Sequence, residues 1–382
     1  MTRKGRRAHG EGSVYEQRPG LWAAAVDLGW VNGKRRRKYV YATTEAEAVR
    51  KRDELRRQLR LGFDLTAPPR TLAAWLAEWL QDVKAHDDTR SSTLRRYREV
   101  VDHHLIPALG NVMLDKLTAR QVQRFLTSLK AQVAPATIVK IHGVLRVALS
   151  DAERMDLVPR NVAKAAKPPS LPRSERRALT HDEARALLSA IAGDRLEPLF
   201  VTLLATGLRR GEVLGLRWSD IDQDGEVLHV RQTLQRVGGR LSFVPPKTHR
   251  SARALPLSKL AVRALKQQRA RQAEERLQAG EAWHELGVAF ASVIGTPMEP
   301  RNVNRRFEQL RSRAGLSWLR LHDLRHAFAT FLLDDGVELR TVMELLGHST
   351  IRLTADTYGH VLPARAREAA SVIDKAFGKE SG

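Results

Sequence analysis

The chain has 382 residues, no cysteine and a formal net charge of +22 at pH 7. The lack of cysteine excludes disulfides, thiolate metal sites and cysteine nucleophiles, and the length permits two or three domains. The charge indicates a polyanionic partner, and nucleic acid comes before a membrane surface. No apolar run is long enough for a membrane-spanning helix, and the N-terminus, MTRKGRRAHG, lacks the apolar core of a signal peptide.

Residues 1–64 predict a small β-rich unit with one helix. Three short segments that contain Val, Tyr or Trp and are separated by Gly-containing turns predict strands: Ser13–Glu16, Leu21–Leu28 and Arg35–Tyr41. Thr44-x-x-Glu47 predicts a capping box for a basic helix that runs to about Leu61. A sheet backed by a helix can present strands to a DNA groove. The third segment supplies our candidate DNA contacts: Lys34, Arg35, Arg36, Arg37 and Lys38. A solvated, disordered basic arm is the alternative.

Residues 70–166, which follow a proline-containing linker, are predicted to be all helical. Apolar residues recur at helical spacing in four segments, which begin near Leu72, Ser92, Thr118 and Pro135. The second helix is expected to end by Pro107. The tryptophans lie on an apolar stripe, so we expect them in a core rather than stacked on bases. Candidate phosphate contacts in this region are Thr93, Arg95, Arg96, Lys140 and Arg146, with a solvated helix face as the alternative for each.

Residues 178–382 follow a second linker, Lys167–Arg177, and are predicted to form a mainly helical domain with a small sheet. An apolar helix over Leu196–Thr206 should end at Gly207, which places Arg209 at a loop or helix start. Glu212 lies three residues further on and is expected to hold an arginine guanidinium. Strands are predicted over Val227–Thr233, Leu241–Val244 and Arg253–Leu257, with Lys247 at the turn between the last two. A long basic helix should span Ser258–Leu277.

The C-terminal stretch places several donors near one hydroxyl. His322 and Arg325 are three residues apart and would share a helix face. A short helix should end at Gly347, and His348 follows directly. Tyr358 is the only tyrosine after Tyr97. A phosphodiester is attacked best by a positioned hydroxyl while fixed positive donors hold its non-bridging oxygens, so this combination of residue types suits phosphoryl transfer.

Five short motifs together resemble a known family. HDLRH, LLGHST and DTYGH, in that order, resemble the C-terminal signature of the tyrosine recombinase, or phage integrase, family. Upstream, ATGLRRGEVLGLRW at 205–218 resembles the first arginine motif of that family. Pro246-Lys247-Thr248, followed by Arg253–Leu257, resembles its lysine hairpin. Each motif alone is weak, whereas their shared order over about half of the chain is specific.

The resemblance implies a mechanism and a set of catalytic residues. Tyr358 would attack the scissile phosphate and form a 3′-phosphotyrosyl link, with release of a 5′-hydroxyl. Arg209 and Arg325 would clamp the phosphate oxygens, and Glu212 would support them. His322 would act as general base, His348 as hydrogen-bond donor and Lys247 as general acid. Arg209 is preferred to Arg210 because the family arginine follows the Thr-Gly-Leu turn directly. No metal and no nucleotide cofactor is implied.

The resemblance also implies an architecture and partners. An α+β multidomain chain is expected, with an arm-type DNA-binding domain of three strands and a helix at 1–64. A helical, SAM-like core-binding domain would follow at 70–166, and a mainly helical catalytic domain with a small antiparallel sheet at 178–382. The expected activity is site-specific recombination for a phage or mobile element, through a Holliday junction. The partners would be duplex DNA at core and arm attachment sites, three further copies of the chain in a tetramer, and, in many family members, an excision factor and a DNA-bending host protein. The expected setting is the bacterial cytoplasm and nucleoid, with no membrane partner.

Other readings remain open at this point. A non-catalytic DNA-binding regulator on the same scaffold would be expected to lack one of the matched residues, and none is missing. A type IB topoisomerase would use similar chemistry without recombination. His322 and His326 have the i, i+4 spacing of two metal ligands, but the glutamate of an HExxH site is absent. His348 alone is also compatible with a simple helix-end histidine.

Overall fold

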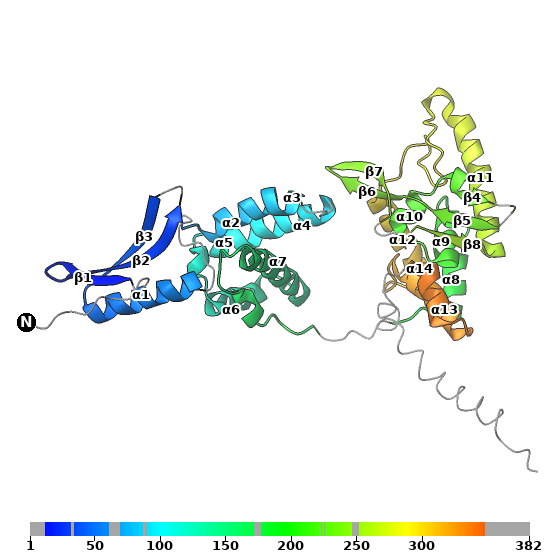
Figure 1. Cartoon of the computed structure of the whole chain (residues 1–382). Helices are drawn as coiled ribbons and strands as arrows, with labels where there is room; N and C mark the ends of the chain where they lie inside the picture. Colours follow the sequence, from blue (N-terminus) through cyan, green and yellow to red (C-terminus); the bar gives the residue numbers. More distant parts are fainter. Residues whose placement is uncertain are drawn as a thin grey trace, which may run out of the picture. The chain divides into compact units, whose positions relative to one another are not determined.

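The computed structural model describes residues 12–31, 34–60, 69–86, 89, 91–171, 177–222, 224, 226–246 and 252–347. Lys247, His348 and Tyr358 lie outside the described residues. The chain divides into two compact units, Met1–Ser174 and Glu175–Gly382, and each is considered by itself (Figure 1). Within the described segments, no helix is both long and apolar enough to cross a bilayer.

The N-terminal region is an antiparallel sheet with one helix. Its elements are β1 (Ser13–Arg18), β2 (Leu21–Val31), β3 (Lys34–Ala42) and α1 (Glu45–Arg60), with β2 in the centre of the sheet. Helix α1 runs along one face of the sheet (Figure 1), where Ala24, Ala42 and Ala48 form a small core. The Thr44 hydroxyl accepts a hydrogen bond from the Glu47 amide at 3.3 Å, as at a helix N-terminus. The predicted strands and helix are confirmed, and a disordered arm is wrong for residues 12–31 and 34–60.

The next region consists of helices around a core rich in large apolar side chains. Its helices are α2 (Leu72–Glu78), α3 (Lys84–His86), α4 (Ser91–Val100), α5 (Ile106–Leu109), α6 (Ala119–Ser128) and α7 (Pro135–Arg154). Wider π-type turns at Trp79–Val83 and Val101–Leu105 join α2 to α3 and α4 to α5. The expected end by Pro107 is therefore wrong. Pro107 lies in the first turn of α5, directly after a π-type turn that ends with the Ile106 amide bonded to the Val101 carbonyl, and the helical path continues past the proline.

The tryptophans of this region are structural. Trp75 and Trp79 have no exposed surface, which confirms the core prediction and excludes stacking on bases. The Trp79 indole N–H donates to Asp151 at 2.7 Å, and the Lys84 ammonium lies 3.0 Å from the same carboxylate oxygen. The Trp75 indole donates to the Ala148 carbonyl at 3.1 Å. Each buried indole thus has the hydrogen-bond acceptor that it needs.

The C-terminal unit packs seven helices around small sheets in its described part. The helices are α8 (His181–Ile191), α9 (Glu197–Thr206), α10 (Arg210–Leu214), α11 (Lys259–Ala279), α12 (Pro300–Arg313), α13 (Asp323–Asp334) and α14 (Leu339–Leu346). One sheet joins β4 (Ile221–Asp222), β5 (Val227–Val230) and β8 (Arg253–Pro256), and a hairpin joins β6 (Thr233–Val237) and β7 (Arg240–Val244). Helix α9 is apolar and buried around most of its surface and packs against α11 and α13. The predicted fold class is confirmed.

One predicted strand is two. The predicted strand Val227–Thr233 leaves the first sheet after Val230 and enters the hairpin at Thr233. Between them the Gln232 side-chain amide donates to the Gly215 carbonyl at 2.7 Å. A side-chain bond to a distant backbone carbonyl therefore holds the turn, and local alternation carries no signal for it.

Gly207 and Gly347 end two helices that meet at the candidate site. Both adopt left-handed backbone angles, with φ of 62° at Gly207 and 63° at Gly347. A Cβ at Gly207 would lie 2.5 Å from Phe328 and 3.1 Å from Leu346. This position requires glycine for its backbone angle and also for the close approach of α13 and α14.

Gly207→Ala should lower the free energy of unfolding by about 2–4 kcal/mol, because left-handed strain of about 1–2 kcal/mol adds to overpacking against Phe328. Gly193→Ala is the matched control: φ is +75° there, but no atom lies within 4 Å of the added Cβ. Urea unfolding should show the strain alone for Gly193→Ala. Equal losses in the two variants would contradict the packing argument.

Candidate active site

Arg209 stands at the N-terminus of α10 and is fixed by Glu212. The Arg209 Nη1 donates to Glu212 Oε1 at 2.7 Å, and its backbone amide donates to Glu212 Oε2 at 2.9 Å. The Glu212 side chain is only 5% exposed, whereas that of Arg209 is 38% exposed. A charge-assisted pair of this kind sets the direction of the guanidinium and leaves part of it accessible. The predicted contact between Glu212 and an arginine is confirmed.

Arg325 is buried and joins the ends of two helices. It comes from the first turn of α13 and is 3% exposed. Its Nη1 donates to the Gly207 carbonyl at 2.7 Å, at the C-terminus of α9, and its Nη2 donates to the Leu346 carbonyl at the C-terminus of α14. A cation is favoured at such helix ends because the last carbonyls carry partial negative charge and lack helical partners.

Three arginines from distant segments meet at the end of α14. Arg253, on β8, donates from Nε to the Leu345 carbonyl at 2.6 Å. Arg325 binds the carbonyl of Leu346, and Arg209 reaches that of Gly347 at 3.4 Å. Consecutive carbonyls are thus each bound by a different guanidinium. The next residue along the chain is His348.

Glu212 is the anion that the cluster shares. Its Oε2 also accepts from Arg253 Nη2 at 3.1 Å, and the Arg253 side chain is 7% exposed. Burial raises the pKa of Glu212, but the charges and hydrogen bonds of Arg253 and Arg209 outweigh it, so the pKa lies below its ordinary value of 4.5. Glu212 is therefore a carboxylate in the folded chain near neutral pH.

The lowered pKa of Glu212 gives a pH-dependent contribution to stability. For a carboxyl whose pKa is lower in the folded chain, the contribution is complete above the unfolded value, near 4.5, and is lost as pH falls through the folded value. The difference in unfolding free energy between wild type and Glu212→Gln should therefore be constant from pH 7 to about pH 5 and shrink below that. Urea titrations at several pH values measure it. A difference that grows on acidification would contradict this assignment.

His322 precedes α13 and is exposed. Its ring meets that of His326 edge to face, with centroids 5.1 Å apart. The neighbouring Asp323 accepts from the Arg320 amide at 2.8 Å. Burial raises the pKa of Asp323, while the hydrogen bonds and charge of Arg320, together with His326, hold it below its ordinary value. Within the described residues, no group of three or more histidine or acidic side chains is placed to hold a metal ion.

The described part of the site thus brings together Arg209, Glu212 and Arg325, with His322 at the start of the helix that carries Arg325. Arg253 belongs to the same cluster and was not among the predicted site residues. Lys247, His348 and Tyr358 lie outside the described residues. Of the two adjacent arginines, Arg209 contacts Glu212 and the end of α14, whereas Arg210 is exposed.

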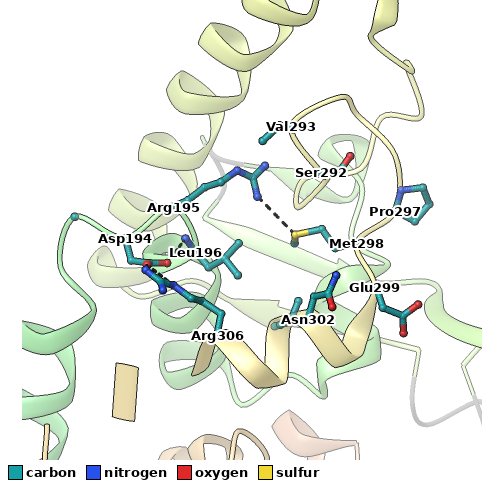
Figure 2. A pocket seen from close by; sticks show the side chains of 12 residues that line it. Asp194, Arg195, Leu196, Ser292, Val293, Pro297, Met298, Glu299, Asn302 and Arg306 are labelled. Atoms are coloured by element: carbon teal, nitrogen blue, oxygen red, sulfur yellow. Dashed lines mark hydrogen bonds and ion pairs between the residues drawn. The ribbon is translucent and has the colours of Figure 1, made fainter. Parts of the chain in front are cut away.

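A separate pocket of about 830 Å³ lies in the same unit. Figure 2 shows that two arginines of its wall contact other lining residues: Arg306 donates from Nε to Asp194 at 2.7 Å, and Arg195 reaches the Met298 sulfur. Arg195 also donates to both oxygens of Glu275, at 2.6 and 2.9 Å. The candidate catalytic residues that the structure describes, Arg209, His322 and Arg325, do not line the pocket. Its walls are internal ion pairs and apolar side chains, so we do not assign it to the chemistry.

The candidate DNA contacts of β3 divide between the two faces of the N-terminal sheet. Side chains alternate along a strand, and Val40 and Ala42 of β3 pack toward α1. Arg36 and Lys38 share that face, and Lys34, whose side chain is outside the described residues, precedes them. The opposite face carries cations and exposed aromatic side chains: Arg35, Arg37, Tyr39, Tyr41, Tyr15 and Trp30.

The aromatic side chains of this face were missed by reasoning that followed charge alone. Tyr15 and Tyr41 flank Ala23 in register, and Tyr39 lies opposite Ala25. These three tyrosines are 43–48% exposed, while Ala23 and Ala25 beneath them are buried. The alternation of side chains along β3 indicates from the sequence that Tyr39 and Tyr41 share a face with Arg37. Arg35 is paired with Asp27, and that hydrogen bond lowers the pKa of Asp27.

The candidate contacts in the helical region lie on two helices. Arg95 and Arg96 are exposed on α4, where Thr93 is partly buried, and Arg96 lies over the Tyr97 ring at 5.9 Å. Lys140 and Arg146 are exposed on α7. Exposure leaves these groups able to reach a phosphate, and their contact with DNA stays a prediction.

Comparison with known proteins places the chain in a family. The sequence profile of the Phage integrase family matches residues 177–365, and that of the Phage integrase, N-terminal SAM-like domain matches residues 71–130. A Tyrosine recombinase XerC-like protein of Caldanaerobacter subterraneus subsp. tengcongensis is 30% identical over 91% of this chain and 93% of its own length. An integrase of Streptomyces ambofaciens is 30% identical over 97% and 98%.

Solved structures share the fold. The Tn1549 transposon integrase in complex with a circular intermediate DNA is 20% identical, with a TM-score of 0.66 over 78% of this chain and 99% of that one. A lambda integrase tetramer bound to a Holliday junction is 19% identical, with a TM-score of 0.55 over 92% and 96%. The chain belongs to the phage integrase family of tyrosine recombinases. It is accordingly an enzyme of site-specific DNA recombination.

Proposed function

We propose that this chain is the integrase of a phage or mobile element, which cuts and rejoins duplex DNA through a covalent tyrosine intermediate. The observation that carries the proposal is the arginine cluster. Arg209 and Arg325 come from separate helices and meet at the carbonyls of Gly347 and Leu346, directly before His348. Two held guanidiniums at one point suit the two non-bridging oxygens of a phosphodiester, where negative charge builds during transfer.

The proposed reaction is a transesterification. The Tyr358 phenol oxygen attacks phosphorus and its proton passes to His322, while the bond from phosphorus to the 5′ oxygen breaks. Lys247 donates a proton to that oxygen, which leaves as a hydroxyl, and His348 donates a hydrogen bond to the phosphate. Attack of a 5′-hydroxyl from the partner duplex on the phosphotyrosine reverses the step. One phosphoester replaces another, so bond energy is kept and no nucleotide cofactor is consumed.

Glu212 has a supporting role in this scheme. It is held as a carboxylate by Arg209 and Arg253. Its negative charge lowers the electrostatic cost of placing several guanidiniums side by side before substrate arrives. It also fixes Arg209 by two bonds, so the guanidinium need not reorganise when the phosphate binds.

Recombination between two duplexes requires four strand cleavages, so we propose a tetramer of this chain on DNA. The lambda integrase tetramer on a Holliday junction supports that stoichiometry. The helical region and the C-terminal unit would bind the core site. The open face of the N-terminal sheet, with Arg37, Tyr39 and Tyr41, would bind a second, arm-type duplex. Cations and exposed aromatic groups together suit a nucleic-acid surface.

Arg37→Ala should weaken capture of the second duplex by about tenfold or more, because an arginine contact to DNA contributes about 1–3 kcal/mol. Core-site cleavage should stay within about twofold of wild type. The assay holds the chain on an immobilised core duplex and measures retention of a labelled second duplex. Arg36→Ala, on the face toward α1, is the matched control. A stronger effect of Arg36→Ala than of Arg37→Ala would contradict the assigned face.

The function itself is tested by covalent selection. A randomised pool of nicked duplexes is incubated with the wild-type chain in EDTA, and adducts that survive SDS are amplified. A recombinase should enrich one sequence class and attach to the 3′ side of the break, which leaves the 5′ end free for kinase labelling. Failure to form any adduct would refute the proposal. Enrichment of no sequence, together with relaxation of any supercoiled plasmid, would favour a topoisomerase.

A further inference from the structure

We infer that Arg253 is a positioning residue for the reaction, although no motif assigned it a role. This inference rests on the proposed function. Arg253 lies at the start of β8 and makes two kinds of bond at once. Its Nε donates to the Leu345 carbonyl at 2.6 Å, and its Nη2 donates to Glu212 at 3.1 Å. It therefore ties the Arg209–Glu212 pair to the last turn of α14.

The bond to Glu212 assigns Arg253 a positioning rather than a catalytic part. The Arg253 side chain is 7% exposed and that of Glu212 is 5% exposed, whereas Arg209, which the same carboxylate binds, is 38% exposed. Arg253 acts through Glu212, whose second carboxylate oxygen it shares with the Arg209 backbone amide.

The position of Arg253 in the sequence explains why its bonds to Glu212 and Leu345 matter for the reaction. Lys247 precedes it by a few residues, and the residue that follows the α14 terminus is His348. One guanidinium thus anchors the chain shortly after the proposed general acid and just before the proposed phosphate donor. Movement of either anchor would displace a group that acts on the same phosphate, and errors of about 1 Å in such positions cost about 10²-fold in rate.

Arginine is the side chain suited to this position. It offers donors in a planar fork, so one group reaches a carboxylate and a backbone carbonyl in different directions. Lysine supplies a charge but has no fork, and methionine fills similar space without donors. The three side chains therefore separate loss of charge from loss of geometry.

The test measures single-turnover formation of the covalent adduct at saturating DNA, on duplexes selected with the full-length wild-type chain. Arg253→Met should lower the rate constant at least tenfold, and Arg253→Lys should fall between Arg253→Met and wild type. Misfolded protein lowers the amplitude of the reaction, whereas misplaced groups lower the rate constant. Should Arg253→Met fail to fold, Arg253→Lys still decides, with an expected decrease of threefold or more.

Arg195→Met is the matched control. Arg195 also bridges a carboxylate, Glu275, and a backbone carbonyl, that of Ala291 at 2.9 Å, but it lies at the separate pocket. Its rate constant should stay within about twofold of wild type, even if its melting temperature falls. Rate constants within twofold of wild type for both Arg253 variants would overturn the inference, as would an equal decrease in Arg195→Met. Absence of an adduct with wild type would instead refute the proposed function.

Discussion

Tyr358→Phe should abolish covalent capture of DNA, with a decrease of at least about 10⁴-fold in the rate of adduct formation. The substitution removes a single oxygen, and with it the only nucleophile in the proposed scheme, since a phenyl ring cannot attack phosphorus. Binding to the same duplex should be unchanged within about twofold. Denaturing gels of the selected nicked substrate measure the adduct, and gel shifts measure binding.

Tyr97→Phe is a suitable companion for that experiment. Tyr97 is the nearest preceding tyrosine, and its ring stacks on Trp79 with centroids 5.2 Å apart. Loss of its hydroxyl should leave the adduct rate unchanged. An adduct that persists in Tyr358→Phe would show that another side chain is the nucleophile, and peptide mapping of the trapped DNA would then identify it.

Much of the fold was predictable because its signals are local. The capping boxes at Thr118 and Thr180 each use residues three apart, Thr118 with Gln121 and Thr180 with Glu183. Gly207 and Gly347 end their helices in the left-handed conformation for which glycine is favoured. The geometry of a motif contained within one turn can be predicted from the sequence, because all the residues that form it are close together in the chain.

Features that depend on distant partners were not predictable in the same way. The break between β5 and β6 is held by Gln232 and the Gly215 carbonyl, which are 17 residues apart. Arg253 contacts Glu212 and Leu345, at separations of 41 and 92 residues. The lysine-hairpin resemblance includes Arg253 but gives it no role, and the packing of β8 against α14 assigns it a place.

The candidate site was predictable in part. The resemblance to a family named Arg209 and Arg325 before any coordinates, but it did not indicate that each would bind a carbonyl at the end of α14. The sheet face shows a different limit. Charge drew attention to Arg35–Lys38, whereas strand alternation divides that run between two faces and brings Tyr39 and Tyr41 beside Arg37.

Arg325→Lys should lower the rate of adduct formation by about 10²–10³-fold, the usual effect of losing one preorganised donor to a transition-state oxyanion. The charge is kept, but a single ammonium cannot replace a planar fork that reaches Gly207 on one side and Leu346 on the other. The α9 and α14 termini would then lose the guanidinium that is buried between them and bonds to both. Arg340→Lys, on the exposed surface of α14 and 79% exposed, is the conservative control and should change the rate less than about twofold. Because Arg325 holds the helix ends and is also proposed to clamp the phosphate, the rate constant of Arg325→Lys should fall further than that of Arg253→Lys, which loses the anchor alone. The reverse order would mean that the cluster positions the chain without clamping the phosphate.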